Sequence, residues 1–239
     1  MTKLAKRMII LGASIAFLCG LFTKYVSIYY HTDLEVLDSY NSIMIDKNDY
    51  DGMITYGNKK SKKGIIFYPG GKVEYTAYEP LMKSLADKGF FCVLVRMPYN
   101  LAVLNIDAAN GIQEQYPSIK SWYMMGHSLG GSMAGTYLVN NYRDFDGLIL
   151  LASYVSDDLK HTDLDVISIY GTEDGVLDRN KYEKYKVNLP DGYDEMIIQG
   201  GNHAYFGVYG EQKGDGKALI SNEEQIRRTV SVITHLIYK

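Results

Sequence analysis

The chain has 239 residues, of which 46% are hydrophobic and 22% are charged, a balance that suits one or at most two globular domains with a substantial core. It excludes an intrinsically disordered, collagen-like or coiled-coil chain. The formal net charge is −3, so electrostatics give no reason to expect nucleic acid as a partner. The two cysteines and five scattered histidines show no zinc-ligand spacing, and we expect neither a metal ion nor another cofactor.

Residues 1–30 have the layout of a signal sequence or signal anchor. Three basic residues among the first seven precede an uncharged stretch, residues 8–22, and Lys24 follows it. Fifteen residues rise only about 22 Å as a helix, so a full span requires the helix to continue toward residue 30. Because no clear small-residue cleavage site follows, we expect a retained single-pass anchor, with residues 31–239 as one extracytoplasmic domain. Cleavage would make the same domain a secreted protein.

Beyond about residue 51, short apolar runs alternate with longer segments of helical periodicity. This alternation predicts an α/β fold with a mostly parallel central sheet and helices on both faces. The runs are continuously apolar, as expected for strands that are buried on both faces. Residues 31–57 are predicted as one or two antiparallel edge strands. The predicted strands that follow are residues 64–68, 91–96, 122–126, 147–152, 166–170 and 194–199, and the predicted helices are residues 77–88, 101–115, 129–142, 177–185 and 222–237.

The sequence Gly126-His127-Ser128-Leu129-Gly130 lies between a predicted strand and a predicted helix. A G-x-S-x-G string in this position is typical of a nucleophile elbow, a sharp turn that lifts the serine hydroxyl out of the sheet. The glycines are needed because a Cβ at either position would clash with neighbouring backbone. We therefore predict Ser128 as a nucleophile, and we expect His127 to pack beside it without taking its proton.

A serine hydroxyl needs a base, and in this arrangement the acid and then the histidine follow the serine along the chain. Asp174 comes directly after the predicted strand 166–170, and His203 comes after the predicted strand 194–199. We predict Asp174 as the orienting acid and His203 as the general base. A turn-capping aspartate and an ordinary loop histidine are the alternatives. Two other acids are rivals for this role. We expect Glu173 to point away from the site and Asp178 to lie in the first turn of the next helix.

These motifs together resemble those of α/β-hydrolases from residue 64 to the C-terminus, most closely the small capless branch that includes dienelactone-hydrolase-like and alpha/beta hydrolase fold-5 proteins. Residues 67–74 resemble that branch's loop after the third strand, and residues 96–102 resemble its loop after the fourth. The resemblance implies an oxyanion hole made by the backbone N–H groups of Gly71 and Leu129. Dienelactone hydrolases carry cysteine at the elbow, so their substrate is not implied here. Haloalkane dehalogenases and epoxide hydrolases carry aspartate there, which disfavours those reactions.

The sequence leaves no room for a lid domain over the predicted site. Many α/β-hydrolases insert a lid before the acid-bearing strand, but here only thirteen residues, 153–165, are available, so we expect no cap domain. The site should then open at the carboxyl edge of the sheet. Lys72, Tyr99 and Tyr205 lie on loops near this edge and are candidates for contact with substrate.

These inferences lead us to expect a serine hydrolase that cleaves small-molecule carboxylic esters through an acyl-serine intermediate. An acyltransferase would use the same Ser128, Asp174 and His203 with an alcohol in place of water. A catalytically silent hydrolase fold that acts as a binding module at the membrane surface is the alternative from another class. The sequence leaves the oligomeric state and the physiological substrate open.

Overall fold

The computed structural model describes residues 2–40, 45–50 and 52–239. The strands are β1 (Lys47–Tyr50), β2 (Met53–Tyr56), β3 (Lys63–Tyr68), β4 (Phe91–Val95), β5 (Ser121–His127), β6 (Gly147–Leu151), β7 (Asp165–Gly171) and β8 (Asp194–Ile198). The α-helices are α1 (Lys3–Ser27), α2 (Leu34–Ser39), α3 (Glu79–Asp87), α4 (Ile112–Gln115), α5 (Leu129–Asn141), α6 (Arg179–Tyr185) and α7 (Asn222–Ile237). Short 3₁₀ turns are η1 (Tyr75–Tyr78), η2 (Pro98–Asn100), η3 (Ala102–Leu104), η4 (Ile106–Ala109), η5 (Tyr142–Asp144), η6 (Lys186–Asn188) and η7 (Ala204–Phe206).

The strands form one sheet in the order β1-β2-β4-β3-β5-β6-β7-β8. From β4 to β8 every neighbouring pair is parallel, whereas β1 and β2 are antiparallel. The central strands β4 and β6 are buried along their whole length, as their continuous apolar sequences require. The predicted α/β fold with a mostly parallel sheet is therefore confirmed. Parallel strands also bring their carboxyl ends to one edge, which is where the predicted site residues follow β3, β5, β7 and β8.

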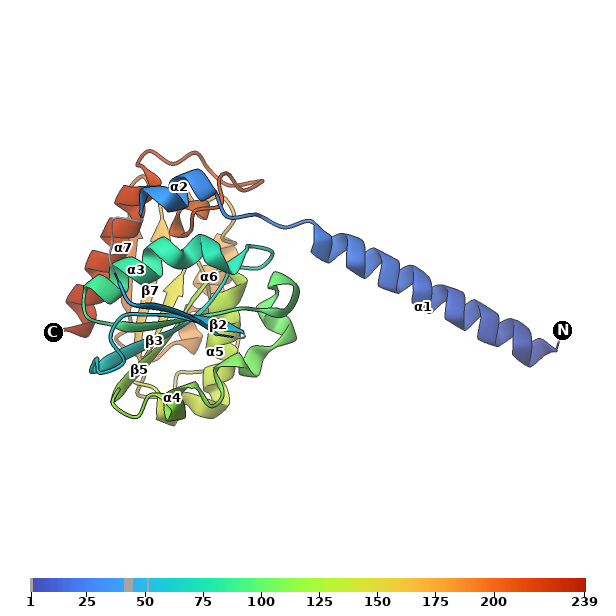
Figure 1. Cartoon of the computed structure of the whole chain (residues 1–239), viewed down its shortest axis with the longest axis horizontal. Helices are drawn as coiled ribbons and strands as arrows, with labels where there is room; N and C mark the ends of the chain where they lie inside the picture. Colours follow the sequence, from blue (N-terminus) through green and yellow to red (C-terminus); the bar gives the residue numbers. More distant parts are fainter. Residues whose placement is uncertain (1, 41–44, 51) are drawn as a thin grey trace.

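Helices cover both faces of this sheet (Figure 1). On one face, α3 and α7 pack against each other and bury Leu81, Met82, Ile226 and Val230 in the larger core cluster. On the other face, α5 contributes Ala134 and Leu138 to the second core cluster, which also includes residues of α4. The segment between β6 and β7 contains no helix or strand, so the domain carries no cap at this point, as the sequence predicted.

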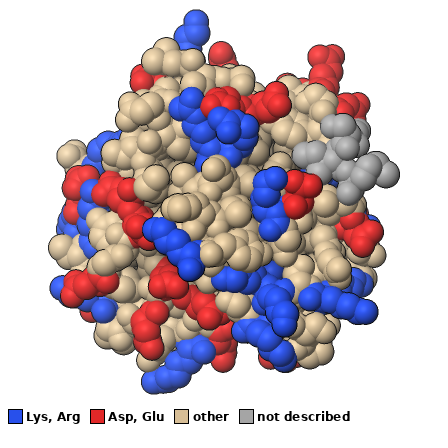
Figure 2. Space-filling model, turned by 90° about the vertical axis from the view of Figure 1, so that its left-hand side faces the viewer, with Lys and Arg blue, Asp and Glu red and all other residues tan. Residues whose placement is uncertain are grey.

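Helix α1 extends from the domain as a straight rod, and only its last turns contact the domain (Figure 1). Its side chains are exposed from Met8 to Tyr25. Among the described residues it is the one helix that is long and apolar enough to cross a membrane. The side of the domain that lies away from α1 carries basic and acidic residues interspersed without a large field of either sign (Figure 2).

The predicted helix 101–115 is wrong. The chain there forms the short turns η3 and η4 and the single turn α4. Leu101 and Asn105 have φ angles of −130° and −154° with ψ angles of 103° and 68°, and Gly111 has a φ of 75°, conformations that a continuous right-handed helix excludes. The Tyr68 hydroxyl stabilises the irregular path, because it donates to the Ile106 carbonyl at 2.7 Å and accepts the Ala109 N–H at 2.9 Å.

The predicted edge strands within residues 31–57 are present in part. Strands β1 and β2 pair antiparallel, and β1 is the edge of the sheet while β2 lies between β1 and β4. Helix α2 was not predicted; Asp33 caps it by accepting the N–H groups of Glu35 and Val36, both at 3.1 Å, which is the usual role of aspartate at a helix start. The rest of that prediction, residues 41–44 and 51, lies outside the described residues.

Candidate active site

Ser128 occupies the tight turn between β5 and α5. Its φ and ψ are 52° and −122°, a strained combination for a residue with a side chain and one that clusters at functional sites. A Cβ on Gly126 would lie 2.5 Å from the Gly130 carbonyl carbon, and a Cβ on Gly130 would overlap the Tyr68 carbonyl oxygen. The turn can therefore form only with glycine at both positions. The Ser153 hydroxyl holds it further by donating to the Ser128 carbonyl at 2.7 Å.

Asp174 and His203 lie in contact at the carboxyl ends of β7 and β8. The Nδ1 of His203 is 2.9 Å from Oδ2 of Asp174, and both side chains are almost wholly buried. The other carboxylate oxygen accepts the N–H groups of Val176 at 2.9 Å and Leu177 at 2.8 Å. Burial alone would raise the pKa of Asp174, but His203 and these two N–H groups outweigh it and hold that pKa below its ordinary value. The carboxylate therefore stays ionised beside the ring.

The two rival acids do not contact His203. The Glu173 carboxylate accepts the Thr172 hydroxyl at 2.9 Å. Asp178 caps α6 by accepting the Lys181 N–H at 3.1 Å, as its expected place at the start of this helix implies.

Ser128 and His203 line the same pocket, of about 230 Å³, at the carboxyl edge of the sheet. The Nε2 of His203 is buried and has no hydrogen-bond partner among the described residues. The Ser128 hydroxyl makes no capping hydrogen bond with α5. The two groups therefore do not hydrogen-bond to each other in this structure, and proton transfer between them requires a side-chain rotation that brings them within hydrogen-bond reach. The other lining residues are Leu129, Ser132, Ala152, Ser153, Tyr154, Val176, Leu177 and Asp178.

Asp215 joins the acid-bearing loop to the base-bearing loop. Its Oδ1 accepts the N–H groups of Gly175 at 3.1 Å and His203 at 3.2 Å, and its Oδ2 accepts that of Ala204 at 2.8 Å. Because Gly175 follows Asp174 directly, this one carboxylate fixes the backbone on both sides of the Asp174–His203 contact. Sequence reasoning missed Asp215, since it lies on an irregular segment without a motif.

Gly71 and Leu129, the residues expected to form an oxyanion hole, lie against each other. A Cβ on Gly71 would be 2.9 Å from Cδ2 of Leu129. Neither N–H donates a hydrogen bond to another group in the described part of the chain. The loop around Gly71 is held on both sides, because Gly70 N–H donates to the Tyr78 hydroxyl at 3.1 Å and Lys72 N–H donates to the Asn100 carbonyl at 2.7 Å. Two unpaired N–H groups beside Ser128 can donate hydrogen bonds to a negatively charged oxygen.

His127 forms a buried pair with Tyr78 behind this loop. Their Oη and Nδ1 are 2.8 Å apart. The tyrosine hydroxyl also accepts the Gly70 N–H at 3.1 Å, so it connects the ring to the loop before Gly71. Burial, and secondarily the neighbouring His203, lower the pKa of His127 well below its ordinary value. The His127 and His203 rings pack with centroids 4.5 Å apart, so His127 supports the second ring as a neutral neighbour.

The three residues named as candidates for substrate contact do not line this pocket. The Lys72 ammonium lies 4.3 Å from the centre of the Tyr25 ring. Tyr99 is 61% exposed and contacts Phe22, and Tyr205 packs against the larger core cluster. Sequence reasoning missed the side chains that do line the pocket beyond the elbow, such as Tyr154 and Val176, because the loops that carry them have no motif.

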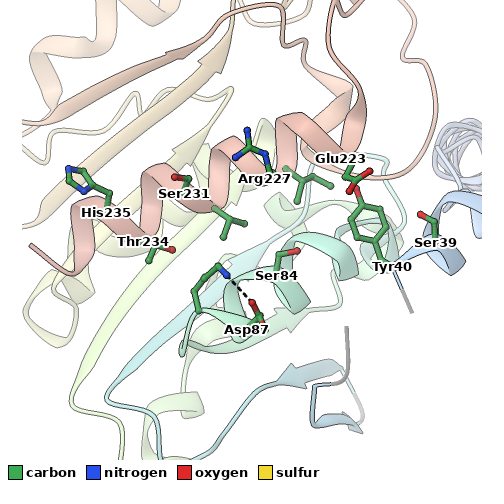
Figure 3. Close-up of a pocket in the computed structure, with 12 residues that line it drawn as sticks. Ser39, Tyr40, Ser84, Asp87, Glu223, Arg227, Ser231, Thr234 and His235 are labelled. Carbon is green, nitrogen blue, oxygen red and sulfur yellow. Dashed lines mark hydrogen bonds and ion pairs between the residues drawn. The ribbon is translucent and has the colours of Figure 1, made fainter. Parts of the chain in front are cut away.

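A larger groove, of about 930 Å³, lies between α3 and α7 (Figure 3). Its polar residues include Ser84, Asp87, Arg227 and His235, and Asp87 pairs with Lys88 at 2.9 Å. It shares no lining residue with the pocket of Ser128 and His203, and among the described residues no hydrogen bond joins its serines to its histidine. In the described part of the chain, no group of three or more histidine, cysteine, aspartate or glutamate residues could hold a metal ion.

Comparison with solved structures shows the same fold in several proteins. A predicted CIB-like hydrolase from Thermoplasma acidophilum has a TM-score of 0.56 at 15% identity, with 80% of this chain and 98% of that chain covered. A dienelactone hydrolase from Anabaena variabilis has a TM-score of 0.59 at 11% identity, with 81% and 97% covered. A monoacylglycerol lipase from Paleococcus ferrophilus has a TM-score of 0.59 at 12% identity, with 81% and 99% covered. At these identities the likeness concerns the fold alone.

No curated protein sequence matches the chain significantly. A sequence model of the Alpha/beta hydrolase family, in contrast, matches residues 64–227. This stretch is more than half of the chain and runs from β3 into α7, so it includes the elbow, the Asp174–His203 contact and the loop around Gly71. The chain belongs to the Alpha/beta hydrolase family.

Proposed function

We propose that this protein is a serine hydrolase that cleaves carboxylic esters through an acyl-serine intermediate. One observation carries the proposal: Ser128 lines the same pocket as His203, whose Nδ1 is 2.9 Å from Asp174 and whose Nε2 has no partner among the described residues. The lipase and dienelactone hydrolase that share the fold support the same class of reaction.

The first half of the reaction forms the acyl-enzyme. The Ser128 Oγ attacks the ester carbonyl carbon while His203 Nε2 takes its proton, and the carbonyl oxygen becomes an oxyanion. The N–H groups of Gly71 and Leu129 donate to this oxygen. Asp174 stays ionised, accepts a hydrogen bond from the Nδ1–H of His203 throughout and stabilises the imidazolium. When the tetrahedral intermediate collapses, the C–O bond to the alcohol breaks and His203 returns its proton to that alcohol.

The second half restores the serine. A water molecule gives a proton to His203 and attacks the acyl carbon, the same two amides hold the oxyanion, and the bond to Ser128 breaks as Oγ takes the proton back. The carboxylic acid then leaves. No cofactor enters either half, since each step is a proton transfer or an acyl transfer between groups already named.

Turnover of a water-soluble ester tests this proposal. The full chain in detergent should hydrolyse p-nitrophenyl butyrate, and Ser128→Ala should lose at least a thousandfold in kcat. Ser132→Ala is the matched control because Ser132 lines the same pocket but donates its hydroxyl to the Tyr154 carbonyl at 2.7 Å; it should keep kcat within about threefold. Equal loss in both variants, or full activity in Ser128→Ala, would contradict the assignment. A folded wild-type chain without turnover would favour a silent binding module.

We also propose that residues 1–30 are a retained signal anchor and that residues 31–239 form the extracytoplasmic catalytic domain. Helix α1 supports this, because its 25 residues extend about 37 Å, more than the hydrocarbon thickness of a bilayer. The basic residues before Met8 favour a cytoplasmic N-terminus. Protease added to intact cells should degrade the domain, and the membrane-bound protein should keep its N-terminal mass. A shortened, released protein would instead show cleavage.

A further inference from the structure

The C-terminal end of helix α1 lies against the domain next to the candidate active site. Its last turns contact the loops that border the candidate active site: Phe22 packs edge-to-face on Tyr99 with ring centroids 5.6 Å apart, and Tyr25 lies under the Lys72 ammonium. Tyr99 belongs to the loop after β4, and Lys72 follows Gly71 directly. The apolar helix therefore ends beside the proposed oxyanion loop.

The segment after α1 is fixed to the same loop. Tyr30 N–H donates to the Lys72 carbonyl at 2.7 Å, and Glu74 N–H donates to the Tyr30 carbonyl at 2.8 Å, so Tyr30 and Val73 form a parallel bridge. Two residues later, Thr32 N–H donates to the Glu74 carboxylate at 2.9 Å. These hydrogen bonds hold α1 at one edge of the domain instead of leaving it on a free tether.

The loop after β4 presents apolar side chains on this same edge. Leu101 and Ala102 are buried and hold the loop in the domain, whereas Tyr99, Val103 and Leu104 are 61%, 50% and 47% exposed. We call these three exposed residues the apolar rim. Neighbouring exposed apolar side chains of this kind mark an interaction surface, and here the surface adjoins the helix that is suited to cross a membrane.

The level of the membrane follows from the helix geometry. Twenty residues are needed to cross about 30 Å of hydrocarbon, so a span that starts after Arg7 ends near Ser27. Phe22 then lies about 7 Å inside the end of that span. Because Tyr99 contacts Phe22, this placement puts its ring just inside the end of the span, close to the boundary between headgroups and acyl chains where tyrosine is enriched. The side of the domain away from α1 carries mixed charges instead (Figure 2).

We propose that the apolar rim rests in the bilayer surface and that the substrate is a lipid ester whose acyl chain stays in the membrane. This inference depends on the proposed ester hydrolysis and names its substrate class. A chain of contacts connects the rim to the chemistry: Asn100 accepts the Lys72 N–H, and Gly71 packs on Leu129, next to Ser128. The lidless pocket would then receive an ester from the bilayer without first exposing its acyl chain to water.

The test uses the full chain reconstituted in phosphatidylcholine vesicles and two esters of the same leaving group. These are p-nitrophenyl butyrate, which is water-soluble, and p-nitrophenyl palmitate, which partitions into the bilayer. The double variant Val103→Asp/Leu104→Asp should lower the rate on the palmitate at least tenfold and leave the butyrate rate within twofold. Val187→Asp is the control because Val187 is 69% exposed and lies before the amino end of β8; it should change neither rate.

A second measurement is independent of activity. Tyr99→Trp should place an indole that brominated phosphatidylcholine quenches by at least half, whereas Val187→Trp should not be quenched and the native Trp122 is buried. Absence of quenching at position 99, or an equal loss on both esters in the double variant, would overturn the inference. If neither ester is cleaved while quenching occurs, the proposed function fails although the rim is at the membrane.

Discussion

The buried hydroxyl of Tyr78 offers a direct way to probe how the oxyanion loop is held. It accepts the Gly70 N–H at 3.1 Å and forms a hydrogen bond with His127 Nδ1 at 2.8 Å. Tyr78→Phe removes both bonds and leaves a buried amide and a buried imidazole nitrogen without partners. Each unsatisfied group costs about 1–3 kcal/mol, so we expect a loss of about 2–6 kcal/mol in the free energy of unfolding. For a domain of this size that corresponds to a melting temperature about 4–24 °C lower.

Tyr78→Phe should also lower kcat, because Gly70 directly precedes the proposed oxyanion donor Gly71. Complete loss of one oxyanion donor lowers kcat about 10²–10³-fold. A donor that is only displaced should lower kcat less, about 10- to 100-fold, with little change in KM. Tyr182→Phe is the matched control: its buried hydroxyl bonds to Ser168 at 2.8 Å, away from the pocket, and it should lower stability alone. Scanning calorimetry and p-nitrophenyl butyrate turnover measure both effects. A Tyr78→Phe protein with normal kcat would refute this role for the loop.

Three further changes test other parts of the site. Asp174→Asn presents an amide donor to His203 Nδ1 and so favours the tautomer whose Nε2 cannot accept a proton; kcat should fall about 10³–10⁴-fold, and steady-state turnover measures it. Gly126→Ala places its Cβ 2.5 Å from Gly130 backbone, and we expect little folded protein by near-ultraviolet circular dichroism. The depressed pKa of His127 means that the unfolded chain binds more protons below about pH 6.5. The free energy of unfolding of the wild type should therefore fall between about pH 7.5 and pH 5.5. This fall should exceed that of His127→Asn by about 1 kcal/mol or more. An equal fall in both proteins would count against a neutral buried ring.

Much of the fold was predictable because buried parallel strands and their helices leave a strong local pattern. The predicted helix 222–237 has the bounds of α7, and the predicted helix 129–142 differs from α5 by one residue. The elbow could be predicted for a physical reason: its glycines and Ser128 lie within five consecutive positions. Asp174 and His203 could be named because each lies on the loop after a strand, β7 or β8, and the carboxyl ends of these strands meet at the same edge of the sheet.

The parts that sequence reasoning missed depend on contacts between distant segments. The expected helix after residue 100 is replaced by turns because Asn100 gives its carbonyl to Lys72 and the Tyr68 hydroxyl bonds to the turn backbone. The Tyr78–His127 bond joins residues 49 positions apart. Lys72 was expected near substrate, but its side chain lies on Tyr25, a partner that no local pattern indicates.

The most direct measurement for the central claim is the site of covalent labelling by a fluorophosphonate. The reagent reacts with a serine that an imidazole activates, so the account predicts a single phosphonate adduct on the peptide that carries Ser128, and no adduct in Ser128→Ala or in heat-unfolded protein. Peptide mass spectrometry locates the modified residue. An adduct on Ser132 or Ser153, or ester hydrolysis by a protein that the reagent leaves unlabelled, would contradict acyl transfer through Ser128.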